Sequence, residues 1–264
     1  MLLDLFKAKP IIDADSKAWI DSAFAWALEN FDNQFFSQRT ELILPTKDYF
    51  PDPASSVEEM AANVFRRVSE YCGLEHWPFK LVEPQNFLPQ QYQLNQPLLI
   101  KRGPLSDNQN LQQMIPDEAK FTVSYDPIQL KQPQVMVANY AAMLSSYLVG
   151  MSGINPPGDT EHRAPAVEIL AIFMGFGVMF TNTAYAFRGS CGSCHVHAAN
   201  RVAVLSENEC VYALALFAQL KGIEPKKVTP HLKKHLRGLY KQAFKQLEKS
   251  PEQQASLQLY LPQN

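Results

Sequence analysis

The sequence lacks the short motifs that identify many nucleotide-binding and hydrolytic enzymes. It has no glycine-rich phosphate loop, no Gly-x-Ser-x-Gly motif and no internal repeat. It therefore gives no support to a P-loop or Rossmann function. Any chemistry has to come from other residues.

Cysteine and net charge are also scarce. Four cysteines in 264 residues are too few for a disulfide scaffold. A formal net charge of −2 does not favour nucleic acid or an anionic membrane as a global partner. The N-terminus has no basic region followed by a long apolar run, so it does not resemble a secretory signal. We therefore expect a cytoplasmic protein that binds no nucleic acid.

The composition is that of a globular protein, with 46% hydrophobic and 19% charged residues. Apolar periodicity and turn residues predict strands at 40–46, 79–84 and 120–127, and helices at 15–31, 55–74, 135–154, 166–188, 206–223 and 229–250. The expected N-caps are Asp15 or Ser16, Ser55 or Ser56, and Ser206, with Pro230 in the first turn of the last helix. These patterns predict an α+β fold in a single compact unit, 1–264. N-terminal helices with a small sheet, 1–127, pack on a mostly helical part, 128–250, and 251–264 form a tail.

Two apolar segments, 135–154 and 166–187, approach the length of membrane spans. However, Asn139 interrupts the first and Glu168 the second, and neither has a clear aromatic belt. Helices buried on all sides of a large soluble domain have the same composition. We expect core helices, with a membrane-associated protein as an alternative.

Three motifs of the second half occur together: "DPIQLKQPQVMVA" at 126–138, "VEILAIFMGFGVMFTN" at 167–182 and "LSENECVYALALFAQL" at 205–220. With this combination, residues 121–222 resemble a group of bacterial zincin-like proteins. In that group, the turn after a strand leads into a helix that carries His-Glu-x-x-His, and a later helix carries an acidic residue. The resemblance implies a zincin-like fold for the C-terminal part.

The zinc-binding motif itself is degenerate, because the sequence reads Asn-Tyr-Ala-Ala-Met at 139–143. A zincin helix needs two imidazoles one turn apart and a glutamate base beside the first. The Asn139 amide and the Met143 thioether are poor zinc ligands, and a phenol with a pKa of about 10, as in Tyr140, is no neutral-pH base. Only Glu168 remains, and we expect it to hydrogen-bond Tyr140 or Asn139. The sequence thus predicts a pseudoenzyme with no catalytic residue and no cofactor, which acts by binding or scaffolding.

The segment "SCGSCHVH" concentrates two cysteines and two histidines. Cys191, Cys194 and His197 form the better set of zinc ligands, since Cys194 and His195 are sequence neighbours, but a fourth ligand is missing. A thiol-redox role would need a surrounding βαβ unit, and the haem-attachment spelling Cys-x-x-Cys-His usually belongs to exported proteins. We favour a structural loop. The alternative is a metal-dependent hydrolase or zinc protein that uses these three residues.

Overall fold

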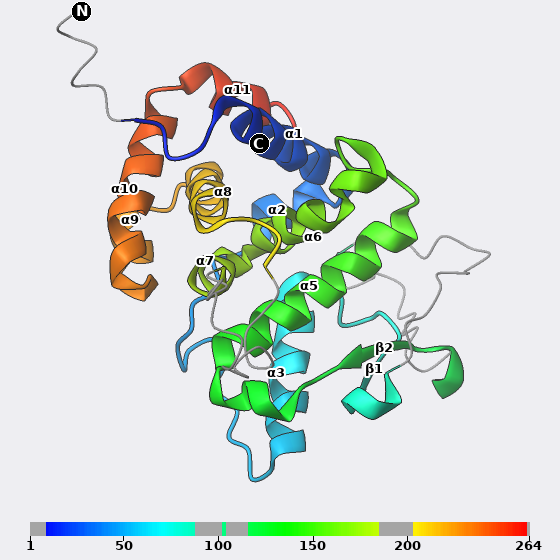
Figure 1. The fold of residues 1–264 in the computed structure, drawn as a ribbon. Helices are drawn as coiled ribbons and strands as arrows, with labels where there is room; N and C mark the ends of the chain where they lie inside the picture. Colours follow the sequence, from blue (N-terminus) through cyan, green and yellow to red (C-terminus); the bar gives the residue numbers. More distant parts are fainter. Residues whose placement is uncertain (1–8, 88–101, 104–115, 185–202, 263–264) are drawn as a thin grey trace, which may run out of the picture.

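The structure is a computed structural model that describes residues 9–87, 102–103, 116–184 and 203–262 (Figure 1). It is mostly helical with one small sheet, so the α+β prediction is confirmed. The main elements in chain order are α1 (Ala14–Asn30), α2 (Asn33–Gln38), α3 (Val57–Cys72), β1 (Phe79–Val82), β2 (Phe121–Ser124), α5 (Pro133–Ser152), α6 (Arg163–Ala171), α7 (Gly177–Thr183), α8 (Glu207–Leu220), α9 (Pro225–Val228), α10 (Lys234–Glu248) and α11 (Pro251–Gln258).

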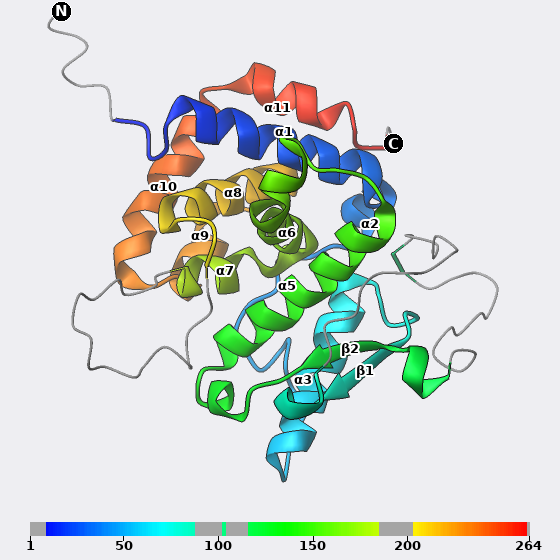
Figure 2. The ribbon, with the colours of Figure 1, turned by 45° about the vertical axis from the view of Figure 1, so that its right-hand side comes forward.

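The helices form two groups joined by α5. On one side α5 packs against α3, and on the other it packs against α6 and α7. Helix α8 lies inside the second group, in contact with α7, α10 and α1. Helix α11 runs beside α1 at the far end from the sheet (Figure 2). The long α5 therefore connects the sheet and α3 to the C-terminal helices.

The sheet consists of β1 and β2, which pair in parallel from Phe79↔Phe121 to Val82↔Ser124. Both strands lie inside the predicted segments 79–84 and 120–127. The sheet packs on α5 through aromatic rings, because Tyr147 lies 5.6 Å from the Phe79 ring and 4.9 Å from the Phe121 ring. The Tyr147 hydroxyl also donates a hydrogen bond to the Thr122 carbonyl, at 2.5 Å.

The strand predicted at 40–46 is wrong. The segment has no regular secondary structure and belongs to no strand. Its Ile43 N–H donates instead to the Gly175 carbonyl, at 3.0 Å. The apolar side chains that suggested a strand, Leu42 and Ile43, are buried because the segment packs against a helix break.

That break divides the helix predicted at 166–188. A π-turn, Ile172–Phe176, separates α6 from α7, and Gly175 has a φ of +104°. A Cβ at Gly175 would overlap the carbonyl oxygen of Glu41, and one at Gly177 would lie 2.8 Å from Leu214 Cδ1. Both glycines thus permit close packing, and Gly175 also permits the backbone conformation of the break.

Two helical segments, Pro133–Ser152 and Asp159–Thr183, are long and apolar enough to cross a membrane. In their most apolar windows, however, 67% and 83% of the residues are buried inside the protein. Their apolar surface is therefore covered by other helices, as in the core of a soluble protein.

Local capping signals explain the starts of α1, α3 and α8. Ser56 caps α3 and Ser206 caps α8, the latter in a reciprocal capping box with Glu209. The N-cap of helix α1 is Asp13, two or three residues before the expected caps, and its carboxylate accepts the Ser16 N–H at 2.8 Å. The predicted caps Asp15 and Ser16 are therefore wrong.

The predicted helix 229–250 is also wrong at its start, since α10 begins only at Lys234. Leu232 is extended, with a ψ of 146°. The Arg237 guanidinium holds this bend by donating to the carbonyls of Leu232 and Pro230, both at 2.9 Å. Residues 251–258, predicted as tail, form α11.

Candidate functional site

Glu168, the acidic residue of the site predicted from the sequence, lies on α6 and is 4% exposed. Its two carboxylate oxygens accept hydrogen bonds from the backbone N–H groups of Val204, at 3.1 Å, and Leu205, at 2.9 Å. These residues directly precede Ser206, the N-cap of α8. The carboxylate therefore holds the entry to α8 against α6, which is a structural role.

The other degenerate positions point toward different neighbours. The Asn139 amide donates to the Gln129 side chain at 2.7 Å. The Tyr140 hydroxyl lies 3.4 Å from the Ala61 carbonyl of α3, its ring packs edge-on against Phe65, and burial raises the pKa of Tyr140. Met143 is half-buried against the core.

The hydrogen bonds expected between Glu168 and either Asn139 or Tyr140 are thus replaced by other partners. No group of three or more His, Cys, Asp or Glu residues that could hold a metal ion occurs among the described residues. Within that part of the chain, positions 139, 140, 143 and 168 do not fit a zinc site. Cys191, Cys194 and His197 lie outside the described residues.

The described residues form a mostly apolar groove of about 720 Å³, which we call the methionine groove. It lies between the 45–57 segment, the first turns of α3 and α5, and Met179 of α7. Its floor contains Met136 and Met179, which are 1% and 0% exposed, and its rim contains Val57 and Met60, which are 42% and 38% exposed. Lys47 is the one charged residue among those that line it.

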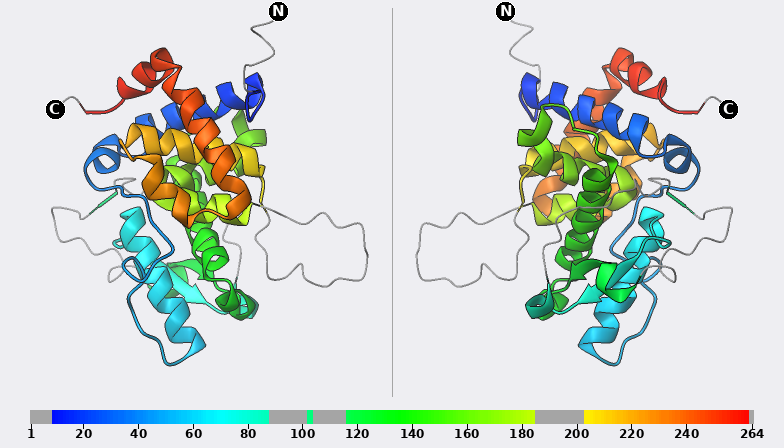
Figure 3. Two further views of the ribbon diagram at one scale, coloured as in Figure 1. Left: turned by 90° about the vertical axis from the view of Figure 1, so that its left-hand side faces the viewer. Right: turned by 90° about the vertical axis from the view of Figure 1, so that its right-hand side faces the viewer.

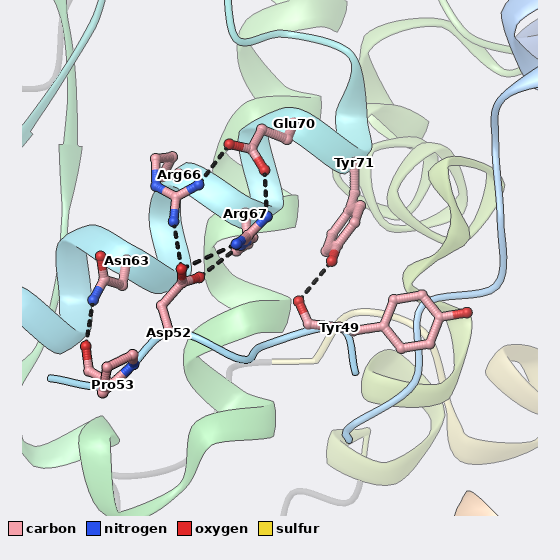
Figure 4. Close-up of polar contacts among 8 residues, drawn as sticks. All are labelled: Tyr49, Asp52, Pro53, Asn63, Arg66, Arg67, Glu70 and Tyr71. Atoms are coloured by element: carbon pink, nitrogen blue, oxygen red, sulfur yellow. Dashed lines mark hydrogen bonds and ion pairs between the residues drawn. The ribbon is translucent and has the colours of Figure 1, made fainter. Parts of the chain in front are cut away.

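One wall of the groove is the proline-rich loop between Pro45 and Ser56. Its Asp52 carboxylate pairs with Arg67 at 2.6 Å and with Arg66 at 2.9 Å (Figure 4). The hydrogen bond from Arg67 holds the pKa of the Asp52 carboxyl below its usual range. Glu70 completes the cluster by accepting from both arginines.

Two further hydrogen bonds attach the same loop to α3. The Asn63 amide donates to the Pro53 carbonyl at 3.0 Å, and the Tyr71 hydroxyl donates to the Tyr49 carbonyl at 2.6 Å (Figure 4). The loop is therefore held in place by the polar face of α3. The groove wall is formed before any ligand arrives, which lowers the cost of binding.

This groove could not be predicted from the sequence, because its residues come from three separate regions of the chain. One local signal was present: Val57 and Met60 are apolar residues beside the acidic first turn of α3. Searches of protein-family models, curated proteins and solved structures return no match for this chain. The zincin-like fold therefore stays a prediction.

Proposed function

We propose that this chain is a non-catalytic, zincin-like binding protein that takes up a small apolar molecule in the methionine groove. The observation that carries the proposal is the groove itself. Its volume of about 720 Å³ falls in the range of roughly 300–1,000 Å³ that small-molecule sites occupy. Exposed apolar side chains that adjoin a preformed concavity mark a binding surface more often than isolated ones do.

The residues that line the groove favour a mostly apolar ligand with one polar group. Three methionines, Met60, Met136 and Met179, line the groove, and their unbranched thioethers adapt to irregular shapes. The buried Thr46 hydroxyl, also in the lining, has no hydrogen-bond partner among the described residues. A ligand with one hydroxyl, ether or carbonyl group would satisfy this buried hydroxyl once the Thr46 side chain rotates toward the groove.

The absence of catalysis rests on the degenerate positions. Three different parts of the protein accept or donate the hydrogen bonds of Asn139, Tyr140 and Glu168. Among the described residues, these side chains therefore do not converge on a common ligand. The Glu168 carboxylate has a structural use instead, because it binds the backbone at the entry to α8. This use explains why an acidic residue would persist after the loss of a metal.

Binding of the neutral dye Nile red tests the proposal. We expect fluorescence enhancement with a Kd of about 10 μM or tighter, and a Kd at least about tenfold weaker for Met60→Glu, which places a charge at the groove rim. Leu259→Glu is the matched control, because Leu259 is apolar and 79% exposed but does not line the groove. Absent binding to the wild type, or equal weakening by both substitutions, contradicts the proposal.

A further inference from the structure

Basic residues are concentrated in one part of an otherwise acidic protein. The segment 224–249 holds eight lysines and arginines against two glutamates, a net charge of +6, whereas the whole chain has −2. The remainder of the chain is therefore strongly acidic. A local field of this kind attracts an anionic partner that the global charge would repel.

Helix α10 presents part of this charge as a stripe. Lys241, Lys245 and Lys249 follow one another at four-residue intervals and are exposed, so they lie along one side of the helix. At about 1.5 Å per residue, the stripe extends over roughly 12 Å. The opposite side of α10 is apolar and packs on α8, which α10 crosses at one side of the molecule (Figure 3, left).

The stripe borders a cleft of about 1230 Å³, which we call the lysine cleft. The N-terminal segment around Ile12 and helix α9 contribute to its walls. Apolar side chains line it: Ile12 and Phe244 are half-buried, and Tyr212 and Leu247 lie buried behind them. The cleft thus combines an apolar interior with a cationic edge.

The cations around the cleft differ in their partners. Lys17 pairs with Asp21 at 2.9 Å, and Lys226 pairs with Glu224 at 2.5 Å. In contrast, Lys241, Lys245 and Lys249 have no acidic partner within the described ranges. Their charges are available to a ligand, with Glu248 as the single carboxylate in the lining.

We propose that the lysine cleft binds an acidic peptide segment of a partner protein, with an apolar side chain of that segment inserted into the cleft. Spaced lysines match carboxylates on successive turns of a peptide, whereas a single phosphate would meet only one or two of them. The volume exceeds the range of roughly 300–1,000 Å³ typical of small ligands. A concave surface fits a chain segment better than a flat bilayer, and the lysine stripe carries none of the exposed aromatic rings on which nucleobases stack.

Fluorescence anisotropy with the labelled peptide Glu-Glu-Leu-Glu-Glu-Phe-Glu-Glu-Leu-Glu-Glu tests this inference. We expect binding at about 50 mM salt that weakens severalfold at about 200 mM, because exposed charges are screened. The triple variant Lys241→Gln, Lys245→Gln, Lys249→Gln should weaken binding at least about tenfold, whereas a control that removes equal charge outside the cleft, Lys227→Gln, Lys233→Gln, Lys234→Gln, should stay within about threefold of wild type.

Three results overturn the inference. Equal losses in the two triple variants mean that net charge alone attracts the peptide. Undiminished binding of a peptide with glycine in place of leucine and phenylalanine means that the apolar interior is not used. Tighter association with phosphatidylglycerol vesicles than with the peptide, lost in the cleft variant alone, identifies a membrane-binding face instead. Circular dichroism of both variants confirms that the fold is retained.

Discussion

Replacement of Gly175 by alanine tests the break between α6 and α7, against which the 41–43 segment packs. Gly175 has a φ of +104°, which disfavours any residue with a Cβ. The added methyl group would also overlap the Glu41 carbonyl oxygen. Because that contact is to backbone, no side-chain rotation relieves it.

The expected loss of stability follows from three contributions. Strain in a sparsely populated backbone conformation costs roughly 1–3 kcal/mol. Displacement of the 41–43 backbone would remove the hydrogen bond from Ile43 N to Gly175 O, with a net value of about 0.5–1.5 kcal/mol. It would also disturb the packing of Ile43, which is 1% exposed. Gly175→Ala should therefore lower the free energy of unfolding by at least about 3 kcal/mol.

Two other glycines supply matched controls. A Cβ at Gly238 or at Gly222 meets nothing within 4 Å, but only Gly222 has a positive φ, of +63°. Gly238→Ala, inside α10, should stabilise the protein by about 0.5–1 kcal/mol. Gly222→Ala should cost about 1–2 kcal/mol from backbone strain alone. Urea unfolding followed by circular dichroism measures all three variants. A loss at Gly175 no larger than that at Gly222 would show that the overlap with Glu41 is absent.

The remaining predictions concern buried polar groups and the metal alternative. Glu168→Gln should lower the free energy of unfolding in urea by about 1–3 kcal/mol, because the amide NH₂ cannot accept one of the two backbone N–H groups that the carboxylate binds. An unchanged unfolding midpoint would contradict that role. Tyr240→Phe should not destabilise the protein at pH 7, because the buried Tyr240 hydroxyl has no partner among the described residues, whereas Tyr212→Phe should cost about 1 kcal/mol through the lost bond to Asp21. Burial raises the pKa of Tyr240, so its contribution to stability is complete below pH 10 and is lost as pH rises above it; unfolding midpoints measured from pH 8 to 11 should fall less for Tyr240→Phe than for wild type. Purified protein should contain less than about one tenth of an equivalent of zinc by mass spectrometry. The double substitution Cys191→Ser, Cys194→Ser should change the unfolding free energy by less than about 1 kcal/mol. Stoichiometric zinc that this double substitution removes would establish the metal-site alternative.

Elements with strong local signals were predictable from the sequence. The caps Ser56 and Ser206 stand directly before amphipathic or apolar runs, and each has a glutamate within the first turn. The two strands are short apolar segments bounded by turn residues. In these places the backbone hydrogen bonds and the side-chain pattern favour one conformation without help from distant residues.

Elements that depend on distant partners were not predictable. The 40–46 segment has the composition of a strand, but its hydrogen bond goes to Gly175, more than a hundred residues away. Likewise, nothing near Glu168 in the sequence indicates that its carboxylate binds the backbone at 204–205, 36 and 37 residues later. The methionine groove has the same origin, since Met60 and Met179 meet only through the packing of α3, α5 and α7.

The N-terminal helices are attached mainly to residues that the ribosome adds much later. Asp21 of α1 accepts a hydrogen bond from the Tyr212 hydroxyl across 191 residues, and Lys221 donates to the Phe36 and Ser37 carbonyls of α2. At roughly 5–20 residues per second, that interval lasts about 10–40 s. Throughout it, the Phe36 ring lacks one of its final neighbours, Phe217. Nascent chains of this protein should therefore expose apolar N-terminal surface until synthesis is nearly complete, and they are expected substrates for ribosome-associated chaperones.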